Sequence, residues 1–407
     1  MRSLSAIVPI SIVLLSILWF TNPFVLQNHT TDVSYFLKST VRYSNPSQNG
    51  SWNLTERGDY DRTINLFVND TWQMVELVNS TLPVETIKND ADSNPVAILS
   101  FPKSILKPGE NLSFTVWYHI ISKPRIIPDI TETAALGLAD IPQNLVDEYT
   151  RGEGSWQTDN QQLVSLASSL KGNKTNVLTI VKNFIEWMRD PQHITYPKDQ
   201  HENPYYPNQT YTLKEGDCDD QAILLVTLCR IVGIPSYLQI GSIYMPHHFE
   251  NISVWNGHVS FVERRVGWHG WAFVYIPPWG WLPVDLTYVP EGFSDPLNAI
   301  KHGAVTLQNT TLFMNVIYTD YVGTSLEDRE FLESNGFQIY AEDEMMQEVK
   351  QDPNTSNPIP TAISMDPRIP IALTVLIVFA AFSSVLVFKR LRNRNARAKP
   401  ERTLPQQ

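Results

Sequence analysis

The chain has 407 residues, of which 43% are hydrophobic, and its formal net charge is −11. This length leaves room for two or three domains, and the acidic surplus excludes nucleic acid as an expected partner because it repels phosphate. The two cysteines, Cys218 and Cys229, fall on one predicted helix. They are about 16 Å apart along its axis, which is too far for a disulfide.

An apolar segment lies near each end of the chain. Residues 1–27 contain an apolar run after Arg2 and are expected to be a signal anchor or a signal peptide. Residues 369–388 form a second run, long enough to span a membrane, and the basic segment 389–407 follows it directly. Basic residues stay on the cytoplasmic side, so we expect a cytoplasmic tail, a stalk over 352–368, and the rest of the chain outside the cell membrane.

The distribution of N-x-S/T sequons agrees with this orientation. They occur between Asn28 and Asn354, and the basic tail contains none. Sequons of this kind accept glycans on the surface of secreted or outward-facing proteins. The pattern therefore predicts a glycoprotein at the cell surface.

Short alternating runs predict β-strands after the expected anchor. Residues 28–125 contain several such runs separated by Asn-Asp, Pro and Pro-Gly turns. An immunoglobulin-like β-sandwich is the simplest domain with this pattern, and no residue in it points to catalysis. Residues 126–157 are interrupted by Pro and Gly and form a connector, with a short helix expected over 143–149.

A helix with a cysteine in its first turn follows two amphipathic helical patterns, at 163–170 and 177–188. Asp217 is its expected N-cap, and Gly233 followed by proline ends it near Val232. Apolar residues surround this helix, which should therefore be buried. The helix dipole should lower the pKa of the Cys218 thiol toward neutrality and so favour the reactive thiolate.

Strand patterns come next, and they bring a histidine and a carboxylate together. Residues 269–276 alternate in polarity with His269 on one face, and residues 281–286 return after a turn at 277–280. In such a hairpin, Asp285 lies within a step or two of the position opposite His269. A thiol, an imidazole and a carboxylate are the parts of a nucleophile–base–orienting acid triad.

These motifs resemble the core of the transglutaminase-like superfamily. The resemblance covers residues 158–290 and rests on the cysteine opening a helix that ends in GIP, on HGWAFVY, on the Gly-Trp turn and on VDLT. It implies an α+β, papain-like fold in which the cysteine helix packs on an antiparallel sheet. It also implies Cys218 as nucleophile, His269 as general base and Asp285 as the orienting carboxylate, with no cofactor and no metal. More loosely, the flanking β domain and membrane segments are similar to archaeal membrane-anchored cell-surface members.

The region that follows, residues 291–351, is expected to be a C-terminal extension of this core. Its pattern predicts a short helix, a strand near 312–318 and an acidic helix over 326–349. The extension carries none of the motifs on which the resemblance rests.

Other histidines and tyrosines near these motifs allow alternative roles. His258 is a rival base, but without a paired downstream aspartate we expect it to be structural. His247 and His248 suggest a metal site, although no further ligands occur at suitable spacing. Three tyrosines upstream of the cysteine are candidates for an oxyanion-stabilising side chain: Tyr205, Tyr206 and Tyr211.

Four carboxylates crowd the expected nucleophile: Glu215, Asp217, Asp219 and Asp220. We expect them to cap the helix and to complement its dipole, with a calcium site as the alternative. Because negative charge raises a thiol pKa, they oppose the helix dipole at Cys218 and make the thiol depend more strongly on its base.

The sequence as a whole predicts a membrane-anchored, outward-facing thiol enzyme that acts on amide bonds of proteins or peptides through an acyl-enzyme. Hydrolysis is favoured slightly over transfer to an amine, since an open, wet surface supplies water. The alternative is a non-catalytic cell-surface binding or envelope module that keeps the fold.

Overall fold

The computed structural model describes residues 31–348, apart from 49 and 198–201. Its main feature is a sheet of eight strands in this part of the chain, seven of which follow the order β12–β9–β10–β13–β1–β8–β4, while β11 pairs with β10. Neighbouring strands are antiparallel except for β10 and β13, which run parallel. The strands are β12 (Thr310–Val316), β9 (Ser236–Val254), β10 (Val259–Ile276), β13 (Gln338–Gln347), β1 (Val33–Ser44), β8 (Asn111–Ser122), β4 (Gln73–Ser80) and β11 (Gly280–Val284).

The N-terminal strands belong to this same sheet. β1 pairs with β8 on one side and with β13 on the other, and β13 pairs in turn with β10. A small three-stranded sheet and a two-stranded pair complete the region. The small sheet has the order β3 (Thr63–Asn65), β6 (Pro95–Leu99) and β5 (Val84–Asn89), and the pair is β2 (Trp52–Asn53) with β7 (Ile105–Leu106). The predicted immunoglobulin-like sandwich over 28–125 is therefore not confirmed, because its longest strands continue the sheet that also contains β9 and β10.

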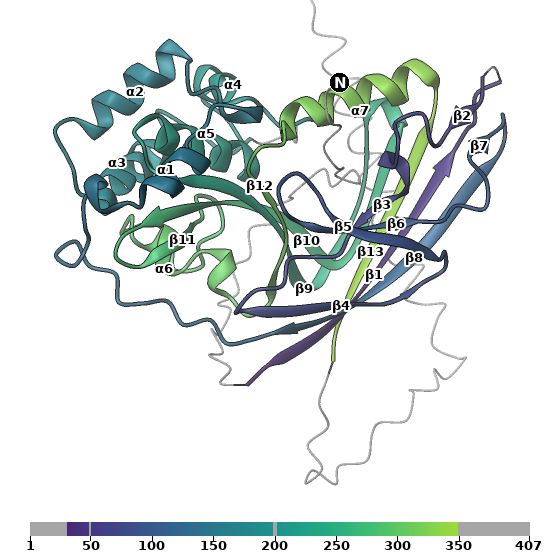
Figure 1. Cartoon of the computed structure of the whole chain (residues 1–407), viewed down its shortest axis with the longest axis horizontal. Helices are drawn as coiled ribbons and strands as arrows, with labels where there is room; N and C mark the ends of the chain where they lie inside the picture. Colours follow the sequence, from purple (N-terminus) through teal and green to yellow (C-terminus); the bar gives the residue numbers. More distant parts are fainter. Residues whose placement is uncertain (1–30, 49, 198–201, 349–407) are drawn as a thin grey trace, which may run out of the picture. The chain divides into compact units, whose positions relative to one another are not determined.

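Helices α1 to α6 gather beside β9, β10 and β11, α7 extends toward β2, and the strands formed by residues 33–122 lie toward the other end of the sheet (Figure 1). The α-helices are α1 (Gln143–Tyr149), α2 (Gln161–Lys171), α3 (Val177–Arg189), α4 (Pro207–Leu213), α5 (Cys218–Ile231), α6 (Asn298–Lys301) and α7 (Tyr321–Asn335). Short 3-10 helices are η1 (Tyr60–Arg62), η2 (Leu138–Asp140), η3 (Gly154–Trp156), η4 (Trp255–Gly257) and η5 (Ala304–Thr306).

The predicted cysteine helix is present as α5. Every residue from Cys218 to Arg230 is buried, because α5 packs on β9 and β10 and is flanked by α2, α3 and α4. Asp220 closes a capping box at its start by accepting from the N–H of Asp217, and Gly233 adopts the left-handed conformation just after its end, with φ of 81°. The helix is thus a rigid mount for the residue in its first turn.

The C-terminal extension differs from its prediction in one element. The strand expected near 312–318 is β12, but the acidic helix expected over 326–349 ends at Asn335. Gly336 takes the left-handed conformation, with φ of 70°, and closes α7. Residues 338–347 then form β13, whose place between β1 and β10 supplies backbone hydrogen bonds on both sides and so overrides the helical pattern.

The segments expected to interact with a membrane cannot be compared with this fold. The signal anchor or peptide at 1–27, the stalk at 352–368, the membrane span at 369–388 and the basic tail at 389–407 lie outside the described residues. Across residues 31–348, apart from the gaps given above, no helix is both long and apolar enough to cross a bilayer.

Candidate active site

The site begins where the amino end of α5 meets the middle of β10. The sulfur of Cys218 accepts a hydrogen bond from the backbone N–H of Gly270. Gly270 allows this contact, because a Cβ at that position would come within 3.0 Å of the Asp219 Cβ and 3.1 Å of its Cα. A side chain there would push α5 away from the strand. The glycine therefore holds the thiol against β10 at the residue that follows His269, and no hydrogen bond joins the sulfur to His269 Nδ1.

His269 is fixed by the carboxylate that the sequence pairs with it. Its Nε2 lies 2.8 Å from Asp285 Oδ2, and both side chains are fully buried. Asp285 follows the end of β11, and β11 pairs with β10 over Ala272 to Ile276, so the hairpin brings the two residues together as predicted. The two side chains therefore form a buried histidine–carboxylate pair.

Asp285 is held as an anion by several donors. Its Oδ2 also accepts from the N–H of Ala304 at 2.9 Å, and its Oδ1 accepts from Thr287 at 3.0 Å and Tyr288 at 2.9 Å. Burial raises the pKa of Asp285, but His269 and these backbone donors outweigh it, so the net pKa is lowered. An ionised carboxylate accepts only, and Nε2 of His269 therefore carries the proton and donates it to Asp285.

The second ring nitrogen of His269 has the properties of a general base. With a proton on Nε2, the neutral imidazole has its lone pair on Nδ1. Within the described residues, Nδ1 is buried and has no hydrogen-bond partner, which leaves its lone pair unused. The thiol of Cys218 forms no hydrogen bond with Nδ1; its sulfur accepts from the backbone N–H of Gly270, the next residue along β10.

The electrostatic environment of Cys218 is opposite to the predicted one. Burial raises its pKa well above the usual range, since its side chain is only 2% exposed, and the carboxylates of Asp219 and Asp217 raise it further. The N–H of Gly270 works in the other direction but does not compensate. The prediction of a thiol pKa lowered by the helix dipole is therefore wrong, because burial, and after it the carboxylates of Asp219 and Asp217, raises the pKa.

The raised pKa predicts how Cys218 reacts with an alkylating agent. The thiol is protonated at neutral pH, and only the thiolate is nucleophilic, so alkylation by iodoacetamide should be slow and should accelerate roughly tenfold per pH unit as the pH rises. The rate is measured by mass spectrometry of the Cys218 peptide between about pH 6 and pH 9. A rate that is high and flat below pH 7 would show a preformed thiolate–imidazolium pair and contradict this expectation.

The carboxylates around the thiol act mainly within the protein. Asp220 accepts from the N–H of Asp217 at 3.1 Å and from that of Tyr205 at 2.6 Å, so it closes the capping box and ties the preceding loop to α5. Burial, followed by the charge of Asp220, raises the pKa of Asp217 to about 8. These contacts agree with the capping role expected from the sequence.

Two tyrosines that the sequence did not single out face the thiol. The pKa of Tyr196 is raised by burial and by the charges of Cys218 and the neighbouring aspartates. Tyr321, at the start of α7, is buried and hydrogen bonds to the carboxylate of Asp219. Tyr196 belongs to the ITY segment within the resemblance, so it was open to prediction. Tyr321 comes from the extension, where no motif pointed to the site.

The three tyrosines proposed for oxyanion stabilisation make their contacts elsewhere. The hydroxyl of Tyr206 donates to Asp320 Oδ2 at 2.9 Å, the ring of Tyr211 stacks near Trp187, and Tyr205 is joined to α5 through its backbone. The backbone N–H of Gly270 is directed at the sulfur and favours a thiolate there.

Potential metal ligands gather at two places in the described residues. Ligand atoms of Asp217, Cys218 and Asp219 lie within 4.8 Å of one another, as do those of His248, Glu250 and Glu263. In the second group, His248 Nε2 is 3.0 Å from Glu263 Oε2, so the two residues already satisfy each other as a histidine–carboxylate pair. The spacing argument missed the two glutamates because β9 and β10 bring them together across strands, with Glu263 opposite Glu250.

The rival base occupies a different environment. His258 directly precedes β10, and its Nδ1 donates to the carbonyl oxygen of Phe337 at 2.6 Å. This contact joins η4 to the segment between α7 and β13. It gives His258 a structural contact, as expected from the missing aspartate partner.

A cysteine at the amino end of a buried helix, packed against a strand that carries a histidine–aspartate pair, is the arrangement found in thiol enzymes. Residues 164–286 match the transglutaminase-like superfamily, and the chain therefore contains a domain of that superfamily. This membership supports a thiol enzyme in general. It agrees with the resemblance seen over residues 158–290.

Solved structures with related folds come from three different sources. A candidate cysteine protease from Cytophaga hutchinsonii is 15% identical, with 79% of this chain and 92% of that chain covered and a TM-score of 0.47. The periplasmic domain of TgpA from Pseudomonas aeruginosa is 12% identical, with 65% of this chain and 90% of that domain covered and a TM-score of 0.29. Red sea bream transglutaminase is 10% identical, with 75% of this chain and 63% of that chain covered and a TM-score of 0.29. No curated protein matches the chain.

Proposed function

We propose that the chain is a thiol enzyme that acts on amide bonds of proteins or peptides through an acyl-enzyme on Cys218. The observation that carries this proposal is the orientation of His269. Its Nε2 is held by Asp285, and its Nδ1 is buried with an unused lone pair within the described residues, on the strand that contacts the sulfur. A purely structural histidine would use both nitrogens or expose one of them to water.

The proposed reaction starts from the neutral thiol. As the sulfur attacks the substrate carbonyl carbon, its proton moves to Nδ1 of His269, and Asp285 supports the positive charge on the ring. The imidazolium then gives that proton to the leaving amine, the C–N bond breaks and a thioester remains on Cys218. In the second half, water attacks the thioester and gives its proton to Nδ1, and the carboxylic acid and the free thiol are released.

Hydrolysis is the preferred outcome of the second half-reaction. The thiol is 2% exposed, and an amine acceptor attached to a protein needs more space to reach a thioester there than a water molecule does. Transfer to an amine requires an acceptor channel that also excludes water. The product of the reaction is therefore proposed to be a carboxylic acid.

The proposed location is the outer face of a cell membrane. Support comes from the sequence, namely the apolar segments at 1–27 and 369–388, the basic tail after them and the distribution of sequons. The substrate would accordingly be a protein or peptide outside the cytoplasm. The acidic surplus of the chain argues against a nucleic-acid partner.

The second candidate is a non-catalytic binding or envelope module that keeps the fold. The low exposure of Cys218 and its raised pKa favour this alternative, because both reduce the reactivity of the thiol. In that case His269 and Asp285 would only stabilise the hairpin of β10 and β11.

One reaction separates these functions. The full chain is incubated with N,N-dimethylated casein and a fluorescent primary amine, so that new amino groups report hydrolysis of peptide bonds, ammonia reports hydrolysis of glutamine, and fluorescent casein reports transfer. We expect new amino groups or ammonia, together with a casein-derived thioester on Cys218 detected by mass spectrometry. Fluorescent casein as the main product would contradict the preference for hydrolysis. If no product and no thioester form, the binding module is the better description.

A further inference from the structure

A pocket lies on the face of the main sheet opposite the catalytic histidine. It has a volume of about 70 Å³, several times the roughly 10–15 Å³ that one water molecule needs. Trp268 lines the pocket, and His269, the next residue on β10, points to the opposite face of the strand, toward Asp285. Gly270, which packs against Asp219 of α5, lies on the same face of β10 as Trp268, so the pocket and α5 lie on one side of the sheet.

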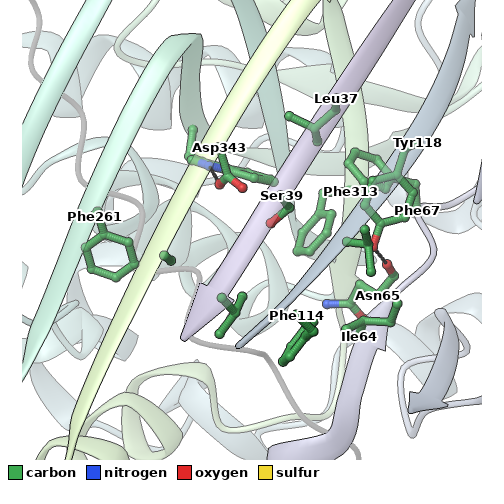
Figure 2. A pocket seen from close by; sticks show the side chains of 14 residues that line it. Leu37, Ser39, Ile64, Asn65, Phe67, Phe114, Tyr118, Phe261, Phe313 and Asp343 are labelled. Carbon is green, nitrogen blue, oxygen red and sulfur yellow. Dashed lines mark hydrogen bonds between the residues drawn. The ribbon is translucent and has the colours of Figure 1, made fainter. Parts of the chain in front are cut away.

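The walls of the pocket are mostly apolar and come from two layers. β1, β8, β10 and β13 supply one wall, and the segment around β3 covers it, as Figure 2 shows. The apolar residues that line it are Leu37, Val41, Ile64, Phe67, Phe114, Val116, Tyr118, Phe261, Trp268, Phe313 and Ala341. Such walls favour an apolar ligand body.

The pocket contains acceptors as well as donors of hydrogen bonds. Asp343, on β13, accepts from the indole N–H of Trp268 at 3.0 Å and from the side chain of Ser39. Within the described residues, no lysine, arginine or histidine forms an ion pair with Asp343. Burial raises the pKa of Asp343 and the charge of Glu342 raises it further, while the hydrogen bonds from Ser39 and Trp268 act in the other direction. The carboxylate therefore has free lone pairs and no cationic partner.

Asn65 supplies a second acceptor. The residue is 2% exposed, and its side-chain oxygen is buried without a hydrogen-bond partner within the described residues. Figure 2 shows the nitrogen of its amide group directed into the pocket. A buried amide oxygen without a donor costs free energy unless something else donates to it.

We propose that this pocket binds a small primary amine with a short apolar body. The apolar walls would enclose the body, and the ammonium group would donate to Asp343, with the Asn65 oxygen as a further acceptor. Charge complementarity decides the class of ligand, because the pocket offers acceptors and a carboxylate without a counter-ion. These groups disfavour an anionic ligand, and a neutral ligand would form weaker hydrogen bonds with them than an ammonium group does. This site takes no part in the proposed reaction at Cys218, so the two proposals stand or fall separately.

The test compares n-butylamine with its neutral isostere n-butanol on the full wild-type chain, using ligand-observed NMR titrations. We expect saturable binding of the amine and at least about tenfold weaker binding of the alcohol, because only the ammonium forms a charge-assisted hydrogen bond. This comparison needs no variant and so does not depend on how a substitution affects folding. Absence of saturable amine binding, or equal binding of amine and alcohol, would overturn the proposal.

Two variants locate the bound amine. Asp343→Asn keeps the shape of the side chain and should weaken amine binding at least about tenfold, with little effect on the alcohol. Glu342→Gln is the matched control, because it removes the same charge from the adjacent residue, which binds Arg264 on the other side of β13. An effect of Glu342→Gln equal to that of Asp343→Asn would mean that the amine responds to the general acidity of the chain and not to this pocket.

Discussion

A chain carrying Cys218→Ala is expected to form no acyl-enzyme and to lose the hydrolytic products of the casein reaction by at least about 10⁴-fold. Alanine keeps the start of α5 but removes the atom that would be acylated. The substitution should leave the capping box of Asp217 and Asp220 intact, because those contacts do not involve the sulfur. Product formation and the thioester are measured as for the wild-type chain.

Cys229→Ala is the matched control for this loss. Cys229 is the other cysteine of the chain, lies on the same helix and is fully buried, and burial raises its pKa as well. Its replacement should leave a small cavity and reduce stability modestly, with product formation nearly unchanged. Equal losses in both variants would indicate that α5 had been disturbed and that Cys218 had no special role.

The local parts of the site were predictable from the sequence because short-range rules determine them. A capping aspartate, an apolar pattern, and a glycine followed by a proline define α5. Alternation and a short turn define the β10–β11 hairpin, and the hairpin alone brings His269 to Asp285. Both features need contacts only between residues close in the chain, so a single sequence is enough to find them.

The assembly of the sheet was not predictable in the same way. β1 and β13 are separated by about three hundred residues in the chain, and their pairing is what joins the N-terminal strands to β10. The same long-range pairing converted a helical pattern after Gly336 into a strand. Local propensity does not contain this information.

The sign of the thiol pKa shift also required the structure. A helix dipole lowers a thiol pKa by an amount that depends on exposure. The sequence predicted a buried helix, but not that Cys218 in its first turn is only 2% exposed. Burial and the carboxylates of Asp219 and Asp217 therefore decide the direction. The consequence is mechanistic, since a protonated thiol depends on His269 during the attack itself.

Asp285→Asn tests how the thiol's dependence on His269 is maintained. We expect the substitution to lower the rate of acylation by roughly 10²–10⁴-fold. Each oxygen of Asp285 accepts two hydrogen bonds. Oδ2 accepts from His269 and Ala304, and Oδ1 accepts from Thr287 and Tyr288. An asparagine has one acceptor oxygen and one NH₂ group, so each of its two orientations directs the NH₂ toward a pair of N–H donors. The fold should lose about 1–3 kcal/mol, and the neutral amide cannot support an imidazolium.

The measurements separate lost chemistry from lost stability. Urea unfolding gives the free energy of unfolding, and the casein reaction at a pH where the variant is fully folded gives the rate. Asp295→Asn serves as the control, because that exposed carboxylate accepts only a local bond from the N–H of Leu297 and should leave both values unchanged. The double variant His269→Ala with Asp285→Asn should be scarcely slower than His269→Ala alone, since Asp285 acts through the ring. Additive losses would mean that Asp285 contributes to the reaction by a route that does not pass through His269.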